Sequence, residues 1–284
     1  MSANLYALGA IILWASLASL SVSLRHVPPF LLTGVALLIG SIPSWPLIRQ
    51  WRVPLSTLAI GIFGLFGYHF LFFVALRLAP PVQANLVNYL WPLLIVVLAP
   101  LYLRGVTLKA LHIVAAVMGF AGAAIAILGD SIFGGSPSVQ GLGFSSSTAW
   151  GFVLAAGSAF VWASYSLLTR RVKAFPTAAI GLFGLISGLL ALLCHAVLEP
   201  AVALSAQDWT LLAILGLGPL GSAFYLWDYA LKRGDARQIG VLSYLTPLGS
   251  TALLIVVSGR PWSWSIALAA ALIIGAAVVS SRMK

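Results

Sequence analysis

The sequence predicts an all-α polytopic membrane protein in which ten transmembrane helices form two inverted five-helix repeats. Three observations lead to this prediction: the apolar composition, the alternation of charge between loops, and an internal sequence repeat. Of the 284 residues, 61% are hydrophobic and 7% are charged, whereas a soluble domain has about 25% charged residues. Because so few charges cannot cover a water-facing surface, we expect most of the chain to face lipid.

Ten apolar stretches, each of roughly 20 residues and long enough to cross a bilayer, follow one another along the chain. Backbone amides find no water in lipid, so each stretch is expected to be helical. The first stretch has no Lys or Arg before it and is too long for a signal-peptide core, so we expect it to remain as a helix. The predicted spans are 4–24, 29–48, 55–76, 81–103, 108–129, 149–169, 176–197, 209–231, 237–258 and 263–281.

The loops at one end of these spans hold twelve Lys and Arg residues, and the loops at the other end hold Arg25, Arg77 and Arg260. By the positive-inside rule the richer end is cytoplasmic, so we expect both termini in the cytoplasm. The net charge of +10 predicts no nucleic-acid partner, because the basic residues stand singly or in pairs between apolar runs. The twelve are Arg49, Arg52, Arg104, Lys109, Arg170, Arg171, Lys173, Lys232, Arg233, Arg237, Arg282 and Lys284.

The two halves of the chain resemble each other. "LWAS" at 13–16 matches "VWAS" at 161–164, an offset of 148, and "NYLWP" at 88–92 matches "SYLTP" at 243–247, an offset of 155. Five spans in each half is an odd number, so the halves must cross the membrane in opposite directions, as in many secondary transporters. The expected units are a first repeat at 1–130, a Gly- and Ser-rich external linker at 131–148, and a second, inverted repeat at 149–284.

Pro92 and Pro247 stand near the middles of the fourth and ninth spans. Proline has no N–H, so the carbonyls of Asn88 and Ser243 are expected to lose their helical partners. Irregular backbone at this depth is tolerated where it is buried in protein or lines a wet cavity. We therefore predict a helix-break hinge at each proline, with a cavity between the two breaks.

Polar and aromatic side chains gather at the same depth. Trp and Tyr usually prefer the membrane interface, so their position at mid-span indicates a cavity rather than a lipid-facing surface. Aromatic walls with few charges favour a substrate that has an apolar or aromatic side chain, and the ring faces also suit a cation. The predicted substrate-binding residues are Tyr68, His69, Phe72, Asn88, Tyr89, Trp91, Trp162, Ser243 and Tyr244.

Two residues are candidates for proton coupling. Asp228 lies inside the eighth span, where charges are often functional, but Lys232 is four residues later, and a structural helical ion pair is the preferred explanation over proton coupling. His69 is either a titrating group or a neutral hydrogen-bonding one. With one cysteine, Cys194, scattered histidines and no HExxH, GxSxG or Walker-type motif, we expect no metal site, no cofactor and no enzymatic activity.

The broken fourth and ninth spans, the "WAS" at the start of each half and the five-plus-five plan resemble the drug/metabolite transporter superfamily, EamA branch. "GYHFLFFVAL" at 67–76 followed by "ANLVNYLWPLL" at 84–94 resembles the YddG-type aromatic amino acid exporters within it. The resemblance implies a bacterial inner-membrane protein that exports amino acids, aromatic ones preferred, and methyl viologen-like cations, by alternating access. It implies amino acids and membrane lipid as partners and no obligate protein partner.

Other functions fit the sequence less well. A proton-coupled exporter of drugs or other small metabolites is the main alternative, although Trp14 stands at the depth where an acid would be expected. A transporter of phosphorylated sugars needs Lys or Arg at mid-membrane, and the sequence places none there. A lipid-modifying enzyme needs a convergent nucleophile, base or metal cluster, and a scaffold would have no cavity.

Overall fold

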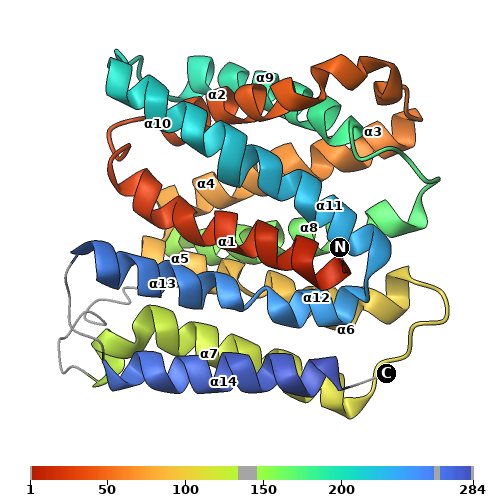
Figure 1. The fold of residues 1–284 in the computed structure, drawn as a ribbon. Helices are drawn as coiled ribbons and strands as arrows, with labels where there is room; N and C mark the ends of the chain where they lie inside the picture. The colour runs from red at the N-terminus through yellow and green to blue at the C-terminus, as the bar shows by residue number, and fades with distance from the viewer. Residues whose placement is uncertain (1, 134–145, 259–262, 283–284) are drawn as a thin grey trace.

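The computed structural model describes residues 2–133, 146–258 and 263–282, and every regular element in these ranges is helical (Figure 1). The first half contains α1 (Ala3–Val22), α2 (Pro29–Ser41), η1 (Ile42–Trp51), α3 (Leu55–Ile62), η2 (Phe63–Gly67), α4 (Tyr68–Leu78), α5 (Pro81–Asn88), α6 (Trp91–Tyr102) and α7 (Ala110–Phe133). The second half contains α8 (Ser146–Arg171), α9 (Ala179–Leu198), α10 (Ala206–Leu217), η3 (Gly218–Ser222), α11 (Ala223–Arg233), α12 (Ala236–Leu242), α13 (Leu245–Ser258) and α14 (Trp264–Ser281).

Nine helical segments in the described part of the chain are long and apolar enough to cross a membrane, rather than the ten predicted. The first predicted span is present as α1, but the stretch Ala3–Leu17 that meets the apolar criterion is shorter than a full crossing. The nine segments are Pro29–Trp51, Leu55–Leu78, Pro81–Tyr102, Ala110–Gly129, Ser146–Arg171, Ala179–Leu198, Ala206–Arg233, Ala236–Val257 and Trp264–Ser281. The protein is therefore an all-α, multi-pass membrane protein, as the composition predicted.

The two halves pack in the same way. Helix α1 lies against α11 and α13 of the second half, and α8, its counterpart, lies against α4 and α6 of the first half. Helices α7 and α14 pack along each other at one edge of the bundle, and α2 and α9 pack together at the opposite edge (Figure 1). Helix α7 ends, and α14 begins, at the same end of the bundle, so these two counterparts run in opposite directions (Figure 1).

Besides η1, which ends the span that begins with α2, four interruptions break the described spans, and these four come in matched pairs. Helix α5 stops at Asn88 and α6 starts at Trp91, while α12 stops at Leu242 and α13 starts at Leu245. A five-residue π-helical turn, η2, also precedes α4, and another, η3, precedes α11 at the same offset of 155. The proline positions pointed to the first pair of breaks, but nothing in the sequence analysis predicted the π-helical turns. Such turns are frequent at functional sites because they re-aim the side chains that follow.

The segment 131–148, which was predicted to be an external linker, is helical at both ends. Helix α7 continues to Phe133 and α8 already begins at Ser146, and 134–145 lie outside the described residues. The carbonyl of Ser243 loses its helical partner at Pro247, as expected, but it is not left free. It accepts the N–H of Thr246 at 3.0 Å, because the chain closes a tighter turn at this break.

Glycines allow α2 and α9 to come close together. A Cβ added to Gly188 would lie 2.9 Å from the carbonyl oxygen of Gly34, whereas one added to Gly184, one turn earlier, would meet the carbonyl oxygen of Leu37 at 3.4 Å. Association of helices in lipid depends on such close packing, since lipid tails are as apolar as Leu.

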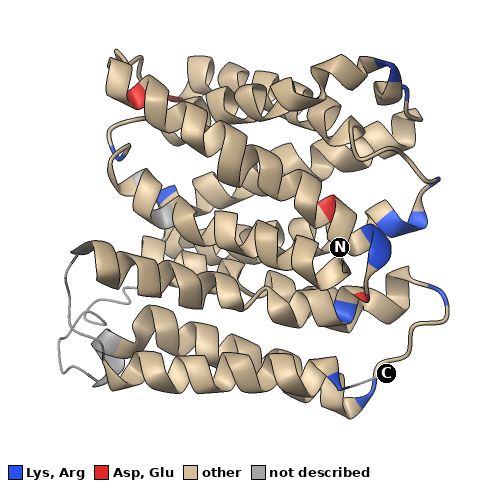
Figure 2. Ribbon diagram, viewed as in Figure 1, with Lys and Arg blue, Asp and Glu red and all other residues tan. Residues whose placement is uncertain are grey.

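Charged groups mark the two ends of the bundle. Lys and Arg concentrate at the end where α1 begins and α14 ends (Figure 2). At the opposite end the buried carboxylate of Glu199 accepts the backbone N–H groups of Phe30 and Leu31 and binds the Arg77 guanidinium at 2.7 Å. Glu199 thereby ties the start of α2 to the ends of α4 and α9.

Replacing Gly188 by Ala should destabilise the protein, because the added methyl group meets a backbone oxygen that cannot move cheaply. We expect a loss of about 1–3 kcal/mol, typical of an overpacked core, measured as a lower melting temperature in detergent. Gly184→Ala on the same helix is the matched control and should melt close to the unmodified protein. Equal melting of the two variants would contradict the packing of α2 against α9.

The concentration of basic residues at one end predicts opposite accessibility for Gln50 and Ala201, which are exposed at opposite ends of the bundle. In a Cys194→Ser background, a membrane-impermeant maleimide should label Ala201→Cys in intact cells and Gln50→Cys only in inverted vesicles. Labelling of both positions from one side would overturn the predicted threading.

Candidate functional site

A cavity of about 130 Å³ lies in the middle of the bundle, bounded by helices of both halves. Seven of the nine predicted substrate-binding residues line it: Tyr68, His69, Phe72, Asn88, Tyr89, Trp91 and Trp162. The sequence analysis did not assign the other six lining residues to the site, and they are Trp14, Leu17, Asn85, Leu220, Phe224 and Thr246. The lining contains no Lys, Arg, Asp or Glu.

Part of this lining lies in the π-helical turns or directly after them. Tyr68 and His69 are the first residues after η2, and Leu220 belongs to η3, with Phe224 just after it. A π-helical turn replaces the i→i+4 hydrogen bonds of the α-helix by i→i+5 bonds, which changes the direction of the side chains that follow. In each turn region a ring nitrogen also donates to a backbone carbonyl, as the next two contacts show.

His69 Nδ1 lies 2.6 Å from the carbonyl oxygen of Leu65, one turn earlier in η2. Since a carbonyl only accepts, Nδ1 carries the proton in this contact. On the other side, Trp14 Nε1 donates to the carbonyl of Pro219 in η3 at 3.1 Å. Two cavity-lining rings are therefore hydrogen-bonded to backbone carbonyls of the two turns, and these contacts fix the orientation of the rings.

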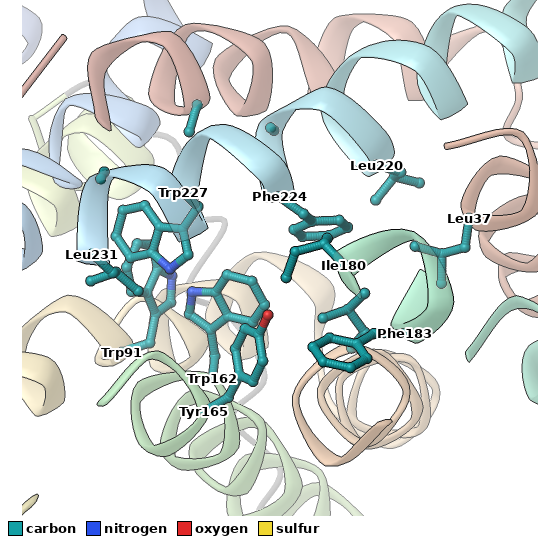
Figure 3. Packing of buried hydrophobic residues seen from close by; sticks show 14 of the residues in the cluster. Leu37, Trp91, Trp162, Tyr165, Ile180, Phe183, Leu220, Phe224, Trp227 and Leu231 are labelled. Carbon is teal, nitrogen blue, oxygen red and sulfur yellow. The ribbon is translucent and has the colours of Figure 1, made fainter. Parts of the chain in front are cut away.

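An aromatic box forms one wall. The ring centroid of Trp14 lies 5.7 Å from that of Trp162, 5.2 Å from that of Trp227 and 6.3 Å from that of Trp91. The rings of Trp91, Trp162 and Trp227 lie against one another, with Phe224 beside them (Figure 3). These separations suit edge-to-face and offset ring contacts. Trp227 stands behind the lining residues, and its Nε1 donates to Ser166 Oγ at 3.1 Å.

A polar edge faces this box. Asn88, which is buried, donates from Nδ2 to the Tyr68 hydroxyl oxygen at 3.1 Å and accepts the Ser158 hydroxyl at Oδ1, 2.8 Å away. Because the Tyr68 oxygen accepts from Asn88, its own hydrogen is available to donate to a ligand. The pair therefore presents a hydroxyl donor held in position by an amide.

The cavity lies where the two halves of the chain meet. Trp14 and Trp162 occupy equivalent positions at the offset of 148 and touch each other, and His69 and Phe224 do so at the offset of 155, with ring centroids 6.3 Å apart. Equivalent residues meet only near the pseudo-symmetry axis. The pairs are unlike in chemistry, however, since Trp91 corresponds to Thr246. The polar side chains come mainly from the first half.

Four other predicted residues lie outside the lining. Tyr244 is fully buried in a separate cluster with Ala123 and Ile273, where Gly119 leaves room for its ring. Ser243 Oγ donates to the carbonyl of Ile239 at 2.8 Å. The structure therefore does not bring Ser243 or Tyr244 to the cavity. Pro92 and Pro247 are also buried, and the residues directly before them, Trp91 and Thr246, both line it.

Asp228 stands away from the cavity. It is buried, pairs with Lys232 Nζ at 2.6 Å and accepts a hydrogen bond from Thr177. Lys232 also donates to the carbonyl of Phe175 at 2.8 Å, so this cluster joins α11 to the segment before α9. Among the described residues, no group of three or more His, Cys, Asp or Glu side chains is arranged to hold a metal ion.

Comparison with known proteins agrees with this architecture. The model of the EamA-like transporter family matches twice, at residues 1–128 and 149–282. An aromatic amino acid exporter YddG from Ancylobacter novellus is 42% identical over 99% of this chain and 98% of its own. An aromatic amino acid exporter YddG from Escherichia coli K12 is 26% identical over 93% and 91% of the two chains. A crystal structure with 40% sequence identity superposes with a TM-score of 0.89 over 98% of this chain and 97% of its own.

Both copies of the family model fall on the helical repeats that surround the cavity, and together they leave out little besides the segment between α7 and α8. The chain belongs to the EamA-like transporter family.

Proposed function

We propose that this protein exports amino acids, with a preference for aromatic side chains, across the bacterial inner membrane by alternating access. The observation that carries the proposal is the uncharged, ring-lined cavity between the two repeats. The 42% identity to a protein named an aromatic amino acid exporter, over nearly the whole of both chains, supports the same substrate class.

The two sides of the cavity suit the two ends of an aromatic amino acid. The side chain packs among Trp14, Trp91 and Trp162, where each ring contact contributes about 0.5–1.5 kcal/mol beyond area burial. The Tyr68 hydroxyl donates to the carboxylate, and the ammonium group rests against a ring face. The lining has no fixed charge that favours a net anion or a net cation, which suits a zwitterion, because its two opposite charges lie close together and sum to zero.

The placement of the breaks supports alternating access. The cavity is smaller than the roughly 300–1,000 Å³ of a typical drug-sized ligand pocket, so loading an aromatic substrate requires the surrounding helices to separate. Trp91 and Thr246 stand directly before Pro92 and Pro247. A hinge at either proline therefore moves a wall of the cavity, with both termini in the cytoplasm as the basic loops predict.

We also propose that the protein exports methyl viologen-like cations and that transport is coupled to protons. Four indole rings close together provide faces that attract a delocalised cation. Of the two coupling candidates, His69 lines the cavity, whereas Asp228 is engaged with Lys232 and Thr177. This favours His69 over Asp228 as the group that couples transport to protons.

Trp91→Ala and Tyr89→Ala should lower counterflow of labelled phenylalanine in liposomes, by about 2- to 10-fold each, because each removes a ring contact with the substrate. Trp209→Ala, at an exposed position on α10, is the matched control and should transport normally. Running the assay with and without a pH gradient distinguishes proton antiport from uniport. Unchanged flux and selectivity in both cavity variants, at equal protein levels, would overturn the site.

Tyr68→Phe should weaken transport of phenylalanine but not of phenethylamine, which has the same ring and ammonium group and no carboxylate. The expected loss for phenylalanine is about 10-fold, since the removed hydrogen bond has a charged partner. Competition by each compound against labelled phenylalanine measures the difference. Tyr6→Phe, remote from the cavity lining, is the control. Equal weakening for both compounds would contradict a role in carboxylate binding.

A further inference from the structure

A second pocket opens at the basic end of the bundle, away from the central cavity. It has a volume of about 400 Å³ and is lined by Tyr102, Leu103, Arg104, Arg170 and Arg171. Tyr102 is the last residue of α6, and Arg170 and Arg171 end α8, so the pocket lies between the ends of two helices from different halves. It shares no lining residue with the central cavity.

The three arginines in this pocket have no carboxylate partner among the described side chains. The acidic side chains that the structure describes are all paired elsewhere. Glu199 pairs with Arg77 and His195, Asp208 with His26, Asp228 with Lys232, and Asp235 with Arg237. Three positive charges therefore face one hollow with no carboxylate in ion-pair contact, and Asp235 acts on Arg170 only from a greater distance, so the hollow has a surplus of positive charge that attracts an anion.

Two contacts give this pocket a defined shape. Arg170 donates from a terminal guanidinium nitrogen to the carbonyl of Gly234 at 2.9 Å, which fixes its side chain against the turn between α11 and α12. The Tyr102 hydroxyl donates to Ser164 Oγ at 3.0 Å and holds the end of α6 to α8. Arg104 and Arg171 are exposed and form no ion pair with a described carboxylate, so both can turn toward a ligand.

We propose that this pocket binds a phosphate group at the basic face of the membrane protein. Guanidinium groups match phosphate oxygens in pairs of hydrogen bonds, and Arg is preferred over Lys where such recognition is needed. Basic pockets between transmembrane helices on the cytoplasmic side are suited to anionic lipid headgroups. The same arginines can also bind free phosphate. Leu103 and Tyr102 provide an apolar edge for the glycerol and acyl part of a lipid.

The test compares Arg104→Gln/Arg171→Gln with a control of equal charge change, Arg49→Gln/Arg52→Gln, whose residues lie at the same end but outside the pocket. Both variants retain Arg170 and its contact with Gly234. Native mass spectrometry of the delipidated full chain measures binding of dioctanoyl phosphatidylglycerol. We expect the pocket variant to bind roughly 30-fold more weakly, because each Arg contributes about 1 kcal/mol of attraction to an anionic headgroup. The control should bind as the unmodified protein does.

Two additional probes identify the source of the phosphate. Inorganic phosphate that competes with the lipid for the site indicates a soluble ligand, and its failure to compete indicates the lipid headgroup; both outcomes support the pocket. Equal loss of binding in the two double variants, or no loss in either, would overturn the proposal. Binding of uncharged dioctanoylglycerol as tight as that of phosphatidylglycerol would overturn it as well.

Discussion

The hydrogen-bonding demand of a peptide backbone in lipid governs this structure. No water reaches the hydrocarbon core, so an unpaired carbonyl or N–H group there costs several kcal/mol. Regular helices meet the demand by themselves, and at a departure from helix the partner comes either from a tighter local turn or from a side chain. At the π-helical turns the partners are the rings of Trp14 and His69. The same two side chains line the cavity, so a change in the irregular backbone would also move the walls of the site.

Two copies of one helical plan here produce a site with unlike sides. The packing of α1 on α11 and α13 mirrors that of α8 on α4 and α6, yet equivalent positions carry different side chains. His69 meets Phe224, and Trp91 has Thr246 as its counterpart. A symmetric backbone supports a rocking motion between two similar end states. The asymmetric lining suits a substrate whose two ends differ, as those of an amino acid do.

The sequence predicted the spans and most of the cavity because both depend on patterns along the chain. Apolar length located the helices, and mid-span aromatic residues located Tyr68, Tyr89 and Trp91. Repeat matching was less successful at Tyr244, because equivalence in sequence fixes a backbone position but not a rotamer. There Gly119 on α7 opens space on the side away from the cavity, and the ring fills it. Trp14 and Phe224, as counterparts of Trp162 and His69, were identifiable from the repeat alone.

The π-helical turns were beyond sequence reasoning for a physical reason. An inserted residue in a helix leaves the apolar content and the length of the span almost unchanged, and Gly64 or Gly221 reads equally well as a packing residue. The ring nitrogens that bond the turn carbonyls mark the two turns in the structure, but a His four residues after a Leu is common in any helix, and Trp14 lies 205 residues from Pro219.

The four clustered indoles at Trp14, Trp91, Trp162 and Trp227 have a spectroscopic consequence. Their ring centroids lie 5.2–6.4 Å apart, and most pairs are strongly inclined to each other. Chromophores this close share excitation, and their inclined orientation makes the shared transition optically active in the near ultraviolet. The protein thus carries an intrinsic chiroptical reporter whose signal depends on the spacing of these rings, and therefore on whatever enters or leaves the chamber that they enclose.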